Sequence, residues 1–213
     1  MMIFTPDRRR GRRRKSGYLL LLFLITVFAV CAAMFLWRGG RWLYNYFSRP
    51  ARYDKIIREA GYRNQIDPAL IKAVIWKESR FDRSARGLKG EIGLMQIMPG
   101  PKFAAADWAQ AHRCRLPSTG ALYDPALNID IGSWYLARAI RRYAKYKDAV
   151  ALGLCEYNAG PQRAADWKPQ NPGDPVIDRI TIPSTKSYVL DILSRYEYYK
   201  GQEKQTLKKK GSQ

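Results

Sequence analysis

Histidine, cysteine and acidic residues are scarce in this chain of 213 residues, and each shortage argues against particular catalytic mechanisms, bound metals or binding partners. His112 is the only histidine, so a Ser-His-Asp or Cys-His mechanism would rest on that one side chain and is not favoured. The three cysteines form no CxxC pair and have no histidine-rich surroundings, which leaves no indication of a bound metal or other cofactor. Cys114 and Cys155 could form a disulfide if their Cβ atoms approach; the alternative is two unpaired thiols.

Acidic residues are outnumbered, because 18 Asp and Glu stand against 38 Lys and Arg and give a net charge of +20. Much of the excess lies in two short tails, residues 1–15 and 200–213. A basic chain suits an anionic partner, such as nucleic acid, phospholipid headgroups or an acidic cell-wall polymer. Charge alone does not choose among these partners.

The N-terminal segment narrows that choice because it predicts a compartment. Residues 1–17 contain the block RRRGRRRK, which is expected to stay in the cytoplasm. Residues 18–37 form an uncharged, apolar run of the length needed to cross a bilayer as one transmembrane helix. After a juxtamembrane linker at 38–51, the rest of the chain is predicted to lie outside the cytoplasm, which argues against nucleic acid as a partner.

Two other readings of the apolar run are less favoured. A signal peptide cleaved near Ala32 or Ala33 would leave the apolar residues up to Trp37 unexplained. A lipoprotein anchored at Cys31 would need a small residue where Val30 stands. The sequence therefore predicts an uncleaved, single-pass anchor.

Beyond residue 51 the pattern is mainly α-helical, with turn residues between the helices. The best-marked helix covers residues 67–78, where Asp67 can cap the first turn and Pro68 takes the first helical position. Further helices are predicted at 52–61 (ended by Gly61), at 128–143, from a cap at Asp148 through Cys155, and at 185–200 (ended by Gly201), with loops at 90–101 and 167–175 and a disordered basic tail at 201–213.

One carboxylate continues an apolar stripe of the 67–78 helix. The stripe consists of Leu70, Ile71, Val74, Ile75 and Glu78. Burial would raise the pKa of Glu78 and make it a proton donor near neutral pH. Alternatively, the stripe ends one turn earlier and Glu78 pairs at the surface with Lys77, Arg80 or a distant base.

Two predicted loops contain side chains that suit ligand binding and that packing of the core alone would not require. In GLMQIMP (93–99), the glycine permits close backbone approach, the glutamine offers a donor and an acceptor, and the methionines present adaptable apolar surface. In EYNAGP (156–161), a phenol and an amide precede a turn. The alternatives are a core-filling loop for the first segment and a simple helix end for the second.

Taken together, five motifs resemble a known family. They are ES (78–79), GLMQIMP (93–99), DPALNIDIGSWYL (124–136), YNAGP (157–161) and TKSYV (185–189). Their order resembles that of the Slt-type, goose-lysozyme-like lytic transglycosylases of bacterial cell walls, and the resemblance covers residues 52–200. It implies a mainly α, lysozyme-like domain with a groove for the glycan strands of peptidoglycan, and it makes Glu78 the catalytic acid.

The resemblance also implies a reaction at the bond between MurNAc and GlcNAc. Glu78 would protonate the leaving oxygen, the substrate's 2-acetamido group would support the cation, and the sugar's own 6-hydroxyl would attack, with Glu78 then acting as base. The product would carry a 1,6-anhydro end, and no second carboxylate falls in a family motif as nucleophile. The substrate-binding positions that the resemblance implies are Ser79, Gly93, Leu94, Met95, Gln96, Met98, Tyr157, Asn158 and Tyr188, the last as a hydrogen-bond partner of Glu78.

Four positions depart from the pattern of many relatives. Gly87 stands where a serine is common, Glu91 and Glu156 stand where an alanine is common, and Ser184 stands where a glutamate is common. We expect these departures to alter contacts around the acetamido group and the pKa of Glu78 more than the class of reaction.

The sequence therefore predicts a peptidoglycan lytic transglycosylase whose domain, residues 52–200, faces the wall from the outer side of the cytoplasmic membrane. Peptidoglycan strands and the membrane are the expected partners, no cofactor is expected, and protein partners are left open. Two alternatives remain. One is a muramidase in which water replaces the 6-hydroxyl, and the other is a catalytically silent glycan-binding scaffold of a wall-spanning complex.

Overall fold

The computed structural model describes residues 24, 27–28, 30–32, 34–37 and 50–210, without the side chains of 206–210. Its contacts divide the chain into two units, residues 1–48 and 49–213. The described residues of the first unit are helical, and no helix in the described part of the chain is long and apolar enough to cross a membrane. The predicted segment 1–17 lies wholly outside the described residues, the predicted span 18–37 is described in half of its residues, and of the linker 38–51 only residues 50 and 51 are described.

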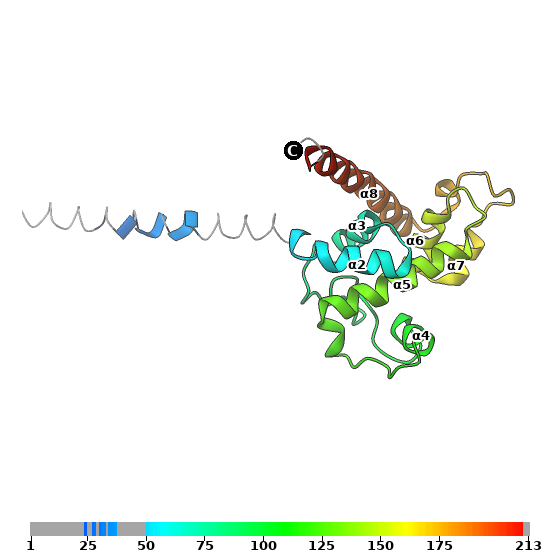
Figure 1. Cartoon of the computed structure of the whole chain (residues 1–213), viewed down its shortest axis with the longest axis horizontal. Helices are drawn as coiled ribbons and strands as arrows, with labels where there is room; N and C mark the ends of the chain where they lie inside the picture. The colour runs from blue at the N-terminus through cyan, green and yellow to red at the C-terminus, as the bar shows by residue number, and fades with distance from the viewer. Residues whose placement is uncertain (1–23, 25–26, 29, 33, 38–49, 211–213) are drawn as a thin grey trace, which may run out of the picture. The chain divides into compact units, whose positions relative to one another are not determined.

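The second unit is built of helices, as the mainly α prediction requires (Figure 1). They are α2 (Asp54–Asn64), α3 (Pro68–Ser79), α4 (Ala104–Ala111), α5 (Pro125–Arg142), α6 (Ala149–Ala159), α7 (Pro161–Asp166) and α8 (Pro183–Lys210), with 3-10 turns η1 (Ala121–Tyr123) and η2 (Ile177–Arg179). Within residues 50–210 the only β-type pairing consists of isolated antiparallel bridges, Arg86 with Ile92 and Ile92 with Ile97.

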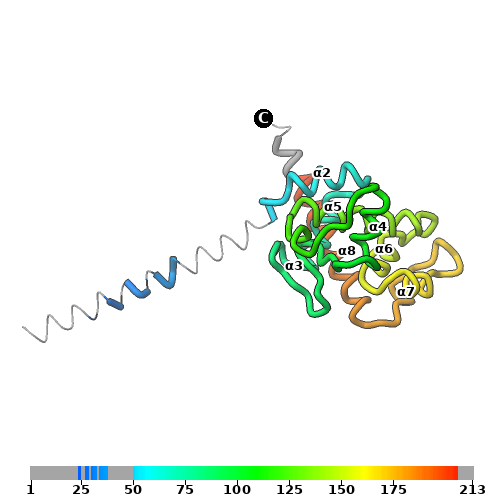
Figure 2. Tube along the Cα trace, turned by 90° about the horizontal axis from the view of Figure 1, so that it is seen from below, coloured from blue at the N-terminus to red at the C-terminus, as the bar shows by residue number. Residues whose placement is uncertain are grey.

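The helices enclose one apolar core. α3 packs along α8, α5 packs along α6, and α2 lies against both α3 and α5. Ile71 and Ile75 of α3, Ile131 of α5 and Leu152 of α6 are completely buried in this core. The long connection between α3 and α4, residues 80–103, has no helix of its own and extends from the helical body (teal in Figure 2).

The start of α3 confirms the predicted cap, because the Asp67 side chain accepts a hydrogen bond from the Ala69 N–H at 2.8 Å and Pro68 is the first helical residue. The predicted stop at Gly61 is wrong. α2 continues to Asn64, and a Cβ on Gly61 would come within 2.8 Å of both the Ile66 carbonyl oxygen and Pro68 Cγ. This glycine permits close packing rather than ending the helix.

Two further predictions concern helix ends. α6 begins at Ala149, directly after Asp148 as predicted, and continues past Cys155 to Ala159. The side chain of Asp148 does not cap α6; it accepts a hydrogen bond from the Val176 N–H at 3.0 Å and so ties down the distant loop. α8 passes through Gly201 and ends at Lys210, so residues 201–210 are helical where a disordered tail was predicted. A single glycine weakens a helix by only about 1 kcal/mol, which a helix of 28 residues can tolerate.

The cysteines outside the apolar run are both free thiols. Cys114 is exposed and Cys155 is buried in the core. The structure thus confirms the alternative in which the two do not pair.

Candidate functional site

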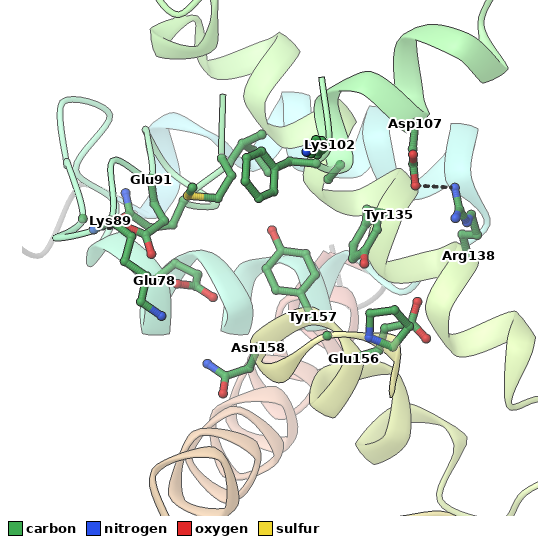
Figure 3. Close-up of a pocket in the computed structure, with 18 of the residues that line it drawn as sticks. Glu78, Lys89, Glu91, Lys102, Asp107, Tyr135, Arg138, Glu156, Tyr157 and Asn158 are labelled. Carbon is green, nitrogen blue, oxygen red and sulfur yellow. Dashed lines mark hydrogen bonds and ion pairs between the residues drawn. The ribbon is translucent and has the colours of Figure 1, made fainter. Parts of the chain in front are cut away.

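A groove with a volume of about 770 Å³ runs between the 80–103 connection and the helices α5 and α6 (Figure 3). Side chains from both walls line it, namely Glu78, Leu88, Lys89, Glu91, Gln96, Ile97, Met98, Lys102, Phe103, Asp107, Tyr135, Arg138, Arg142, Glu156, Tyr157, Asn158 and Pro161. The lining contains aromatic and aliphatic side chains as well as hydrogen-bonding groups. Such a lining suits a ligand that has both apolar faces and many hydroxyl or amide groups.

Glu78 enters the groove from the last turn of α3. The pKa of this carboxyl is raised to about 7: burial is the largest cause, the Tyr188 hydroxyl acts in the opposite direction, and the negative charge of Glu91 adds to the rise. The predicted alternative of surface pairing is wrong, because Lys77 binds Asp191 at 2.5 Å and Arg80 stacks on the Trp76 ring at 3.4 Å. Near neutral pH a large share of Glu78 is therefore protonated.

Tyr188, from the second turn of α8, orients the acid. Its hydroxyl donates a hydrogen bond of 2.6 Å to Glu78 Oε1. Burial, followed by the nearby charge of Glu78, holds the phenol pKa of Tyr188 well above its usual value. The tyrosine hence remains a donor throughout the pH range in which Glu78 titrates, and it fixes one oxygen of the carboxyl while the other can turn to the groove.

The 93–99 loop owes its shape to Asn128, a completely buried residue of α5. The Asn128 amide accepts from the Met95 N–H and donates to the carbonyls of Ile92 and Leu122, each at 2.8 Å. Gly93 has a φ of 77°, and a Cβ there would come within 2.6 Å of the Asn128 nitrogen. Only glycine meets both demands without strain.

Tyr157 and Asn158 complete the wall opposite this loop. The Tyr157 hydroxyl donates to the Met95 carbonyl at 2.8 Å, which joins α6 to the loop. Asn158 Oδ1 accepts from the Thr185 hydroxyl at 2.8 Å. Since the carbonyl oxygen of Asn158 is held in this way, its NH₂ group is the part available to a ligand.

The structure separates the predicted substrate-binding residues into two groups. Gln96, Met98, Tyr157 and Asn158 line the groove together with Glu78. Ser79, Gly93, Leu94, Met95 and Tyr188 lie behind its surface: the buried Ser79 hydroxyl donates to the Leu94 carbonyl at 2.8 Å, and Leu94 and Met95 are completely buried. The second group supports the lining from within the core.

Sequence reasoning missed the charged part of the lining. Arg138 pairs with Asp107 at 3.0 Å, the contact dashed in Figure 3. Arg142 pairs with the buried Glu156, also at 3.0 Å. The two arginines are four residues apart on α5, a spacing that indicates only a shared helix face, so the one available signal was the unusual glutamate at position 156.

Two of the departures noted in the sequence prove to be neighbours. A Cβ on Gly87 would come within 2.2 Å of Glu91 Oε2 and within 2.8 Å of Gln96 Oε1. Glu91 Oε2 accepts a hydrogen bond of 2.9 Å from the Lys89 N–H. The Glu91 carboxylate therefore uses the space that a side chain at position 87 would need.

A helical fold whose groove holds a partly buried glutamic acid with a pKa near 7 defines a class of lysozyme-like proteins, and comparison with known proteins identifies the family. Residues 55–177, more than half of the chain, match the family model described as the transglycosylase SLT domain, and the chain belongs to that family. The resemblance inferred from the motifs is thereby confirmed.

Relatives from three organisms are similar to this chain. It is 28% identical over 155 residues to the soluble lytic murein transglycosylase of Escherichia coli (strain K12), which aligns 71% of this chain with 23% of the relative. It is 42% identical over 89 residues to membrane-bound lytic murein transglycosylase C of Haemophilus influenzae, covering 41% of this chain and 24% of that protein. An inactive mutant of lytic transglycosylase Slt from Pseudomonas aeruginosa superposes with a TM-score of 0.60 at 28% identity, over 70% of this chain and 24% of that one. This chain spans about a quarter of the length of these relatives.

Proposed function

We propose that this chain is a membrane-anchored peptidoglycan lytic transglycosylase that cleaves the β-1,4 bond between MurNAc and GlcNAc without water. The observation that carries the proposal is Glu78, a groove carboxyl whose pKa is raised to about 7 and whose orientation is set by Tyr188. A general acid works best when its pKa lies near the working pH. Family membership and the names of the relatives favour peptidoglycan as the substrate.

In the proposed reaction Glu78 acts twice. Its proton goes to the leaving GlcNAc oxygen as the anomeric C–O bond breaks, and the acetamido oxygen of MurNAc stabilises the positive charge on the anomeric carbon. The 6-hydroxyl of the same MurNAc then attacks that carbon, and the Glu78 carboxylate accepts the hydroxyl proton. The glutamate regains its initial state and the product is a 1,6-anhydro end. Gln96, Tyr157 and the Asn158 NH₂ group are the proposed hydrogen-bonding contacts of the sugars.

A silent glycan-binding scaffold is the less favoured function. A carboxyl that is kept near pKa 7 by burial destabilises the folded chain at alkaline pH, and mere binding would not require this. The muramidase alternative differs from the proposed reaction only in the nucleophile, which would be water in place of the 6-hydroxyl.

Mass spectrometry of the products tests the proposal. The full-length chain, solubilised in detergent, is incubated with purified peptidoglycan beside its Glu78→Gln variant. We expect anhydro-muropeptides from the first protein and none from the second. A folded wild-type chain that releases no muropeptide would refute the enzyme and favour the scaffold.

The proposed anchor is the apolar run at 18–37, with the groove facing the wall from the outer side of the cytoplasmic membrane. In its described part, Phe28, Phe35 and Trp37 are more than half exposed, as side chains facing lipid would be. We expect the full-length chain to stay with membranes during an alkaline carbonate wash. A variant with Leu24→Arg and Phe28→Arg should be washed off, and its retention would argue against the anchor.

A further inference from the structure

The groove contains a carboxylate that the proposed reaction does not use. Glu91 lines the groove together with Glu78 and lies near enough for its charge to act on that residue (Figure 3). The Lys89 N–H holds its Oε2 at 2.9 Å. No protein group in the described part of the chain donates to its Oε1, and no cation there forms an ion pair with it. One carboxylate oxygen is thus fixed and the other can accept a hydrogen bond from a molecule in the groove.

The surroundings keep Glu91 in this position. Because Gly87 has no side chain, the carboxylate fits against the backbone where a Cβ would come within 2.2 Å. The hydrogen bond between the Gly87 N–H and the Glu91 carbonyl, 2.8 Å long, ties the same two residues together through the main chain. The glycine makes room for the carboxylate, and the Lys89 N–H orients one of its oxygens.

Cleavage of a glycosidic bond by two carboxyl groups in one groove is the usual arrangement for hydrolysis, with one group as acid and the other as the base that activates water. We propose that Glu91 is a second catalytic residue that binds and deprotonates a water molecule, so that this chain also hydrolyses glycan strands and releases reducing MurNAc ends beside anhydro ends. This inference rests on the proposed function, since both reactions begin with the same acid.

The hydrolytic step balances without a further reactant. Glu78 gives its proton to the GlcNAc oxygen, and the bond from that oxygen to the MurNAc anomeric carbon breaks with its electron pair going to oxygen. The water oxygen forms a bond to the anomeric carbon, and the water proton passes to the Glu91 carboxylate. Glu78 ends deprotonated and Glu91 protonated, and proton exchange with solvent restores both. The 6-hydroxyl and the water compete for the same carbon.

Borohydride reduction followed by mass spectrometry separates the two products, because it converts reducing ends to alcohols and leaves anhydro ends intact. The full-length chain is compared with Glu91→Gln, which keeps an acceptor for the Lys89 N–H but is a far weaker base, and with Glu91→Asp, which keeps the carboxylate. Glu59→Gln is the matched control, an exposed glutamate outside the groove whose nearest cation, Lys55, is 4.0 Å away. Thermal unfolding verifies that each variant is folded.

We expect both kinds of ends from the wild-type chain and from Glu59→Gln in the same ratio. The share of reducing ends should fall by about tenfold or more in Glu91→Gln, because a positioned base contributes about 10²-fold to the rate. It should recover partly in Glu91→Asp. Isolated anhydro-muropeptides should remain unchanged when they are incubated with the wild-type chain, which would show that reducing ends form during cleavage.

Different failures have different meanings. Anhydro ends without reducing ends from the wild-type chain, or an undiminished share of reducing ends in Glu91→Gln, would overturn the role of Glu91 and leave the proposed function intact. Conversion of anhydro-muropeptides into reducing ends would overturn it as well. Absence of any cleavage by the folded chain would refute the proposed function, and the inference with it.

Discussion

Glu78 and Glu156 are two carboxyl groups of one groove, and the partners that the fold supplies to them differ. Glu78 receives a neutral phenol, the Tyr188 hydroxyl at 2.6 Å. Glu156, whose side chain is only 1% exposed, receives the Arg142 guanidinium at 3.0 Å. A buried carboxyl beside a neutral donor retains its proton until near neutral pH, whereas a buried carboxylate beside a cation becomes part of an ion pair. The identity of the partner distinguishes the candidate acid, Glu78, from Glu156, which forms a structural ion pair.

Replacing Glu78 by glutamine should have the largest effect on activity. The Glu78→Gln side chain can still accept the hydrogen bond from Tyr188, but it has no proton to donate. We expect the rate of muropeptide release to fall by about 10²- to 10⁴-fold, the usual contribution of a general acid, with the fold retained. Glu156→Gln is the control at the other carboxyl. A loss of less than tenfold in Glu78→Gln would mean that another group acts as the acid.

The same substitution should also change how stability depends on pH. The folded state binds the Glu78 proton up to about pH 7, while the unfolded chain loses it near 4.5. The free energy of unfolding of the wild-type chain should consequently fall by up to about 3 kcal/mol as pH rises between these values. Glu78→Gln lacks this contribution, so its stability relative to wild type should increase from pH 4.5 to pH 8. Urea titrations at several pH values would reveal a constant difference if the raised pKa were incorrect.

Removing the Arg142 cation from beside Glu156 should destabilise the fold. Arg142→Met would leave Glu156 buried without its ion-pair partner. We expect a loss of about 2 to 3 kcal/mol in the free energy of unfolding at pH 7, below the range for fully buried pairs because the Arg142 side chain is 42% exposed. Lys186→Met, which breaks the exposed pair with Asp178, should cost less than about 1 kcal/mol. Equal losses in the two variants would show that burial of Glu156 has no energetic consequence.

Removing the Tyr188 hydroxyl should reduce activity less than Glu78→Gln does, and it should shift the pH dependence of activity in a predictable direction. The hydrogen bond from Tyr188 lowers the pKa of Glu78, so Tyr188→Phe should move the alkaline limb of the activity profile to higher pH. Freed from this contact, the carboxyl loses orientation, and we expect the maximal rate to fall by about tenfold, equivalent to one hydrogen bond. The profile of cleavage rate against pH measures both effects. A limb that moves to lower pH would contradict the assigned contact.

The comparison also shows which parts of the site can be predicted from the sequence. Glu78 was identifiable because helix spacing places it on a stripe with Val74 and Leu70, and both of these prove to be buried. The ion pair of Glu156 was not, since its partner lies on a different helix and only the packing of α5 on α6 brings the two together. Local spacing predicts which face a residue occupies, but it does not predict the neighbour from another element.

The loops, too, could be predicted from the sequence only in part. The sequence predicted an irregular, packed segment at 90–101, and glycine at position 93 indicated close backbone approach. It did not indicate that Asn128 would hold the loop through three hydrogen bonds, or that Gly87 would make room for Glu91. Helix ends were predicted well where a side chain caps its own helix, as at Asp67, and poorly where a glycine serves packing, as at Gly61. Asn128 reaches the loop from a different helix, whereas Gly61 and Gly87 are explained by close packing that helix spacing does not describe.

The smallest effect on stability should come from replacing Glu156 by glutamine while Arg142 remains. In Glu156→Gln the amide oxygen can still accept from Arg142, and the guanidinium, being partly exposed, keeps the solvation that a buried cation would lack. We expect the free energy of unfolding at pH 7 to change by less than about 1 kcal/mol, because a buried ion pair gains little over a neutral hydrogen bond once desolvation is included. The same carboxyl would thus tolerate loss of its own charge far better than loss of its partner. Urea unfolding of this variant beside Arg142→Met measures that asymmetry, and equal destabilisation in the two would contradict it.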